Sequence, residues 1–124
     1  MTLAQCINNS VHQCHFEQRQ NGWWPNLTTA DSRPSLAEIG WKLTLIHSEV
    51  SEAAEGFRKD IPDDKLPHRK MSEVELADAV IRIFDLAGAC GFDLGAAVEE
   101  KLAFNAKRAD HKPENRALPG GKKF

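Results

Sequence analysis

Glu49-Val-Ser-Glu52 and Glu75-Leu-Ala-Asp78 are two acidic stretches that lie within strongly helical patterns. In each stretch the two carboxylates are three residues apart, which places them on one face of a helix. If the two helices lie side by side, four carboxylates converge and repel one another. Mg²⁺ would relieve this repulsion, because it takes oxygen ligands and is usually held by a few carboxylates together with substrate phosphates. The two stretches therefore predict adjacent helices that build a divalent metal site.

Length and composition predict one soluble helical domain. The chain has 124 residues, of which 41% are hydrophobic, enough for a single core. We expect a helical domain over residues 1–110 and a flexible basic tail over residues 111–124, where Pro, Gly and basic residues are frequent. The net charge of -2 lacks the basic excess of a protein that binds nucleic acid polymers.

The expected compartment is the cytoplasm. Three cysteines without a C-x-x-C pair argue against a disulfide framework. The amino terminus shows no basic stretch followed by an apolar run, and no apolar segment approaches the length of a membrane span. We therefore expect no membrane partner.

Hydrophobic periodicity predicts four helices and no strands. Two capping boxes, Ser35-Leu-Ala-Glu38 and Ser72-Glu-Val-Glu75, predict where the second and third helices begin. Asp93 is the predicted cap of the fourth helix. The four helices are expected at about residues 3–20, 35–60, 72–91 and 93–109, with a solvated loop over residues 61–70.

The second and third predicted helices differ in their apolar surfaces. The third has only four charged residues between Val74 and Cys90, all within an arc of roughly 80°, so we expect it at the centre of a bundle or at a subunit interface. Those four residues are Glu75, Asp78, Arg82 and Asp85. The second helix carries an apolar stripe that is expected to face the core, formed by Leu36, Ile39, Leu43, Ile46, Val50, Ala53 and Phe57.

Several features allow more than one interpretation. Arg82, four residues after Asp78, could neutralise the acidic arc through ion pairs and so replace a metal. A di-iron centre would require inward-facing Glu-x-x-His motifs, which the acidic stretches do not provide. Trp23 and Trp24, in the loop over residues 21–34, suit either packing on the core or stacking on a base.

With these motifs the chain resembles the all-α nucleoside triphosphate pyrophosphohydrolases, the MazG-like superfamily that includes dimeric dUTPases and dCTP pyrophosphatases. The shared pattern is E-x-x-E on one helix, E-x-x-D on the next, and K-x-x-x-N-x-x-R on the helix after that. The resemblance covers roughly Leu3 to Arg108 and implies an antiparallel four-helix bundle-like MazG fold that forms a homodimer or homotetramer. Two positions depart from the pattern: Ser48, where many relatives carry Glu, and Arg82, where the dCTP-preferring branch carries an aromatic or apolar residue.

The resemblance implies hydrolysis of a nucleoside triphosphate to the monophosphate and pyrophosphate, with Mg²⁺ as cofactor, Mn²⁺ as its substitute, and nucleotide-pool housecleaning as the task. The implied metal ligands are Glu49, Glu52, Glu75 and Asp78, with Glu49 or Glu52 acting on the attacking water. The implied substrate contacts are Lys101, Asn105 and Arg108 for phosphate or sugar, and His15 and Trp24 for base or sugar. The alternative is a nucleotide-binding or helical interaction module that has this fold without turnover.

Overall fold

The structure is a computed structural model that describes residues 1–124, and it is all-helical as expected. No strand is present, and the one strand-like pairing is an isolated bridge between Pro62 and Lys70. None of the helices combines the length and hydropathy that crossing a bilayer requires. The helices in chain order are α1 (Leu3–Gln20), α2 (Leu36–Lys59), α3 (Met71–Ala89), α4 (Leu94–Ala106), the 3₁₀ helix η1 (Ala109–His111) and α5 (Pro113–Arg116).

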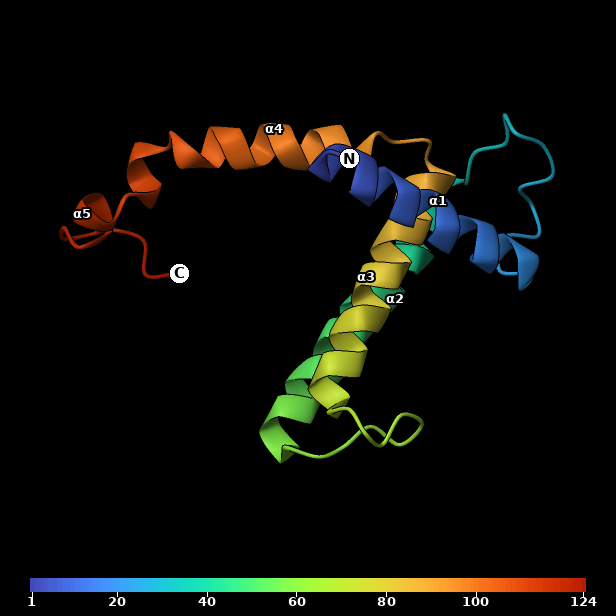
Figure 1. Ribbon diagram of the computed structural model, residues 1–124, viewed down its shortest axis with the longest axis horizontal. Helices are drawn as coiled ribbons and strands as arrows, with labels where there is room; N and C mark the ends of the chain where they lie inside the picture. The colour runs from blue at the N-terminus through green and yellow to red at the C-terminus, as the bar shows by residue number, and fades with distance from the viewer. The chain divides into compact units, whose positions relative to one another are not determined.

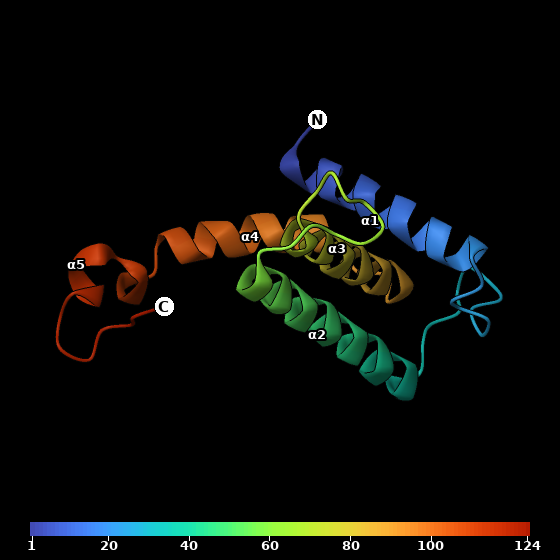
Figure 2. The same ribbon diagram turned by 90° about the horizontal axis from the view of Figure 1, so that it is seen from below.

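The chain divides into two compact units. The larger unit comprises residues 9–92 and holds most of α1 with all of α2 and α3. The smaller unit comprises residues 1–8 and 93–124 and holds α4, η1 and α5. Within the larger unit, α2 and α3 lie side by side and run antiparallel, as Figures 1 and 2 show.

Helix α2 begins and ends as the sequence predicts. The Ser35 side chain accepts the backbone N–H of Glu38, and the Glu38 carboxylate accepts the backbone N–H of Ser35, which completes the capping box. At the other end Asp60 adopts a left-handed conformation with φ of 49° and donates its backbone N–H to the Gly56 carbonyl. This geometry stops the helix before Pro62, which could not have continued it.

Helix α3 begins at Met71, so the prediction that Ser72 caps it is wrong. Lys70 is the N-cap and supplies no side-chain cap, while Ser72 is buried inside the first turn. The loop over residues 61–70 explains the difference. Asp63 is buried and accepts the backbone N–H groups of Lys65 and Leu66, which orders the loop, while its other nine residues are exposed, as expected of a solvated connection.

The core of the larger unit is small and forms around Trp24. Trp24, Leu27 and Ala89 are buried together, and Leu86 packs against them. The Trp24 indole N–H donates to Oδ1 of buried Asp85 at 2.8 Å, which fixes the loop over residues 21–34 on α3. Trp24 is thus the core anchor that one interpretation of the sequence described.

The apolar stripe of α2 is largely exposed, so the prediction that it faces the core of this chain is wrong. Leu36, Leu43, Val50 and Phe57 recur every seven residues and have exposed fractions of 87%, 45%, 52% and 67%. Ala53 is the one buried member of the stripe and lies with buried Gly56 on the side of α2 that packs on α3, while Ile39 and Ile46 are half-buried. Small residues let the two helices approach closely, and the large apolar side chains are left outside that contact.

The smaller unit is organised around the start of α4. The Asp93 carboxylate accepts hydrogen bonds from the backbone N–H of Ala96 and from the side-chain amide N–H of Asn8. The side-chain oxygen of Asn8 in turn accepts the backbone N–H of Gly95 at 2.8 Å. Near the carboxyl terminus, the Arg116 guanidinium donates to the backbone carbonyls of Lys122 and Lys123. The predicted flexibility of residues 111–124 and the domain boundary at residue 110 stay predictions.

The contact between α2 and α3 at Gly56 yields a stability prediction. A Cβ atom on Gly56 would lie 2.6 Å from the backbone nitrogen of Ser72. Gly56→Ala should therefore lower the free energy of unfolding by about 2 kcal/mol, because one helix must shift. Gly40→Ala is the matched control, since nothing lies within 4 Å of its Cβ position, and it should raise that free energy by about 0.5 to 1 kcal/mol. Chemical denaturation measures both, and equal stabilities for the two variants would contradict the close approach.

Candidate metal and substrate site

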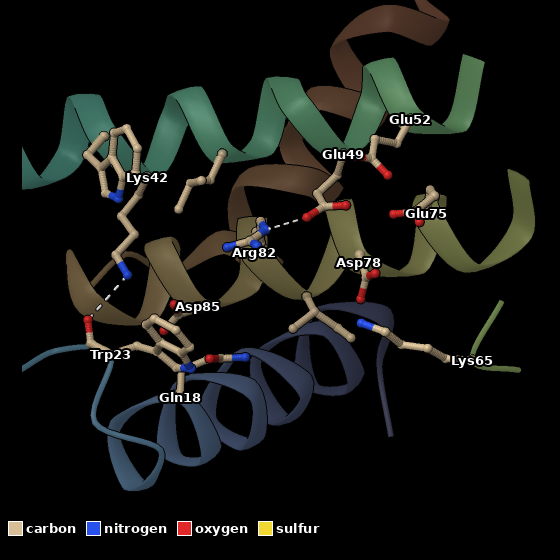
Figure 3. A pocket seen from close by; sticks show the side chains of 13 residues that line it. Gln18, Trp23, Lys42, Glu49, Glu52, Lys65, Glu75, Asp78, Arg82 and Asp85 are labelled. Carbon is tan, nitrogen blue, oxygen red and sulfur yellow. Dashed lines mark hydrogen bonds and ion pairs between the residues drawn. The ribbon is translucent and has the colours of Figure 1, made fainter. Parts of the chain in front are cut away.

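All four predicted acids line one cavity of about 570 Å³ along α2 and α3. Figure 3 shows them gathered at one end of the cavity, with Trp23 and Lys42 at the other end and Arg82 between. Every residue of the lining belongs to the larger unit. The lining residues are Gln18, Trp23, Trp41, Lys42, Leu45, Glu49, Glu52, Lys65, Glu75, Asp78, Ile81, Arg82 and Asp85.

Three of the acids form the tightest group. Carboxylate oxygens of Glu49 on α2 and of Glu75 and Asp78 on α3 lie within 4.8 Å of one another. Glu52 is exposed, lines the same cavity one turn from Glu49, and lies outside that group. The structure therefore brings the two acidic stretches together as the sequence predicts, with Glu52 at the margin.

The acids raise one another's pKa values. A hydrogen bond with Glu49, burial, and the charges of Glu49, Glu52 and Asp78 raise the pKa of Glu75 to about 7. Burial and the charge of Glu49 raise the pKa of Asp78, and the charges of Arg82 and Lys65 partly oppose this effect. Glu75 is consequently protonated about half of the time near neutral pH, and a divalent cation that displaces this proton would be bound by hard oxygen donors.

Arg82 forms an ion pair inside this cluster. Its Nε–H donates to Oε1 of Glu49 at 2.9 Å, across the contact between α3 and α2. The sequence suggested a pair between Arg82 and Asp78 on the same helix, whereas the ion pair that the structure shows joins two helices. One guanidinium offsets one of the four carboxylates, so most of the negative charge in the cluster remains.

The cavity also contains cations and aromatic rings, among them Trp23, for which stacking on a base was one of two interpretations. Lys42 precedes Glu49 by seven residues, and this two-turn spacing could have placed it on the same face. Its Nζ donates to the Trp23 carbonyl at 3.2 Å and lies 4.4 Å from the centre of the Trp24 ring. Lys65 comes from the loop over residues 61–70, and no periodicity signals its position. Trp23 and Trp41 are each 62% exposed.

His15 and Trp24, the predicted base contacts, lie behind the lining of this cavity, in contact with Asp85, which lines it. The His15 ring nitrogen Nδ1 and the Trp24 indole both reach Oδ1 of Asp85, each at 2.8 Å. Both residues line a second cavity of about 400 Å³ with His12, Arg19 and others, and neither lines the cavity that holds the acids. Their contacts favour a structural role.

Lys101, Asn105 and Arg108 belong to the smaller unit. The prediction that the fourth helix carries all three is wrong for Arg108, because α4 ends at Ala106 and the backbone at Arg108 is extended. The Arg108 guanidinium donates to both carboxylate oxygens of Asp110, at 3.0 and 2.7 Å. Oδ1 of Asn105 is buried without a hydrogen-bond partner, so it offers an unused acceptor.

Comparisons of the chain with protein-family models, with curated proteins and with solved structures give no match. The site must therefore be interpreted from its own chemistry. Carboxylate oxygens from two packed helices, in a cavity lined by no Cys or His, suit a hard cation such as Mg²⁺ or Mn²⁺ better than a soft one.

The raised pKa of Glu75 predicts how stability depends on pH. Its pKa of about 7 in the folded protein exceeds the ordinary value of 4.5, so folding retains a proton that the unfolded chain has released. This contribution is complete below pH 4.5 and is lost as the pH rises through about 7, so the melting temperature measured in EDTA should fall over that range. Glu75→Gln should flatten the dependence. Glu73→Gln, on the exposed first turn of α3, is the control that should preserve it.

Proposed function

We propose that this protein is a Mg²⁺-dependent hydrolase that converts nucleoside triphosphates to monophosphates and pyrophosphate. The observation that carries the proposal is the convergence of Glu49, Glu75 and Asp78 in a cavity that also contains cations and exposed aromatic rings. Acids alone would suit many ions. Along the cavity, the acids suit a metal, the cations suit a polyphosphate, and the aromatic rings suit a base.

The resemblance of the two acidic stretches to the MazG-like pyrophosphohydrolases supports the same proposal. Glu49, Glu75 and Asp78 would hold Mg²⁺, with Glu52 next to them. A bound Mg²⁺ supplies charge neutralisation of the triphosphate and lowers the pKa of a coordinated water. Housecleaning of the nucleotide pool is the task that this activity would serve.

Glu52 is the better candidate for the base. Glu49 is engaged by Arg82, whereas Glu52 is exposed to the cavity and forms no ion pair in the structure. Its carboxylate would accept a proton from the attacking water while the bond to the departing pyrophosphate breaks. Glu49 then serves mainly as a metal ligand.

Cations and aromatic rings of the larger unit provide the substrate contacts. Lys65 and Arg82 line the cavity beside the acids and would bind phosphate oxygens. Trp23 and Trp41 present exposed rings on which a base can stack. Lys101, Asn105 and Arg108 remain proposed phosphate and sugar contacts on the strength of the resemblance.

The activity test uses a panel of nucleoside triphosphates with Mg²⁺ and separation of the products. Glu52→Gln and Asp78→Asn should each lower kcat by about 10² to 10⁴, the range for loss of a general base or of a metal ligand. Glu55→Gln is the control, because Glu55 points away to Arg58 and Lys59 and lies outside the cavity. Release of orthophosphate would contradict the proposal, and nucleotide binding without product would favour the inactive module.

We also propose that two copies of the chain pair through the exposed stripe of α2. Leu36, Leu43, Val50 and Phe57 recur at a seven-residue interval, which is typical of helices that pack along their length. A second copy presents the same stripe, so a two-fold axis would bury both at once. The pairing would surround α2 and α3 with helices of the partner, in the bundle-like arrangement that the resemblance implies.

Val50→Glu tests this pairing by placing a charge at the middle of the stripe. Light scattering should give twice the chain mass for the unaltered protein and a single chain mass for Val50→Glu, because a buried unpaired charge is costly. Thr44→Glu adds the same charge on another exposed side of α2 and should preserve the larger mass. A monomeric unaltered protein would contradict the pairing.

A further inference from the structure

Arg82 lies in the middle of the cavity and forms an ion pair with Glu49, one of the clustered acids. Figure 3 places it between the acids and the end that carries Trp23 and Lys42. Its ion pair with Glu49 uses Nε alone, and the two Nη groups carry four further N–H donors outside this hydrogen bond. A ligand that extends from the acids to the aromatic end must pass this guanidinium.

The ion pair and a bound metal would draw on the same carboxylate, that of Glu49. Glu49 contributes to the three-carboxylate group in which the oxygens lie within 4.8 Å, and its Oε1 accepts the Arg82 hydrogen bond at 2.9 Å. A cation bound by these carboxylates would also be repelled by the nearby guanidinium. Phosphate oxygens attract a guanidinium at least as well as a carboxylate does, and they can accept two of its donors at once.

We propose that Arg82 is an exchangeable counter-ion, which holds Glu49 in the absence of a divalent ion and transfers to the phosphate oxygens of a bound magnesium polyphosphate. This inference rests on the proposed function for the identity of the ligand. Side-chain exposures of 38% for Arg82 and 14% for Glu49 fit this division of roles, because the guanidinium has room to swing and the carboxylate does not. Arg82 is then a substrate-positioning residue at a position where the resemblance to the dCTP-preferring branch implies an aromatic or apolar one.

The exchange predicts that loss of the Arg82 guanidinium raises the affinity for Mg²⁺ and lowers the affinity for a polyphosphate. In nucleotide-free protein, Arg82→Gln should bind Mg²⁺ about fivefold more tightly or better, because a competing positive charge is gone. At saturating Mg²⁺ the same variant should bind tripolyphosphate about tenfold more weakly, because charge-assisted hydrogen bonds are lost. Titration calorimetry measures both affinities without turnover.

Two further variants separate the exchange from general effects of charge. Arg82→Lys retains the charge, so its Mg²⁺ affinity should stay near that of the unaltered protein while its tripolyphosphate affinity falls. Arg58→Gln removes the same charge from an exposed pair with Glu55 on α2 and should change neither affinity. An unchanged Mg²⁺ affinity or an unchanged tripolyphosphate affinity in Arg82→Gln would overturn the exchange.

Failure of the exchange and failure of the proposed function give different results. If the unaltered protein releases no pyrophosphate from any nucleotide while Arg82→Gln shows both affinity changes, the function is wrong and the exchange stands. If pyrophosphate is released while Arg82→Gln binds tripolyphosphate normally, the function stands and Arg82 only neutralises Glu49.

Discussion

The close contact between α2 and α3 is the constraint on which the site depends. At Gly56 the backbone of one helix meets the backbone of the other, and this approach carries the acids of both helices into one cavity. Packing brings like charges together, so it works against their mutual repulsion. The cluster is tolerated because Arg82 neutralises one carboxylate and a proton is retained on Glu75 near neutral pH.

These two compensations have different physical characters. The proton on Glu75 is held by a neighbouring carboxylate and by burial, and a divalent ion would displace it directly. The guanidinium is part of the chain, so it can only move aside and must find another anion. A cluster balanced in this way suits a ligand that brings a cation and anions together, such as the metal and polyphosphate of the proposed function.

Local patterns predicted the helices, and long-range contacts decided where those predictions failed. Ser35 and Ser72 stand in the same kind of capping motif, yet only Ser35 caps a helix, because α3 starts two residues earlier than its motif predicts, with Lys70 at the N-cap. The acids were predictable from their spacing. Lys65 was not, because it reaches the cavity from a loop, and the exposed stripe of α2 shows that periodicity identifies an apolar face without identifying its partner.

Trp23 and Trp24 are neighbours in sequence with opposite surroundings. Trp24 is buried and tied to Asp85, whereas the ring of Trp23 stands at the rim of the cavity with 62% of its surface exposed. The first residue fixes the loop, so the second can vary while the backbone that carries it stays in place. Single substitutions at position 23 could therefore change the ligand preference of the cavity with little effect on the stability of the fold.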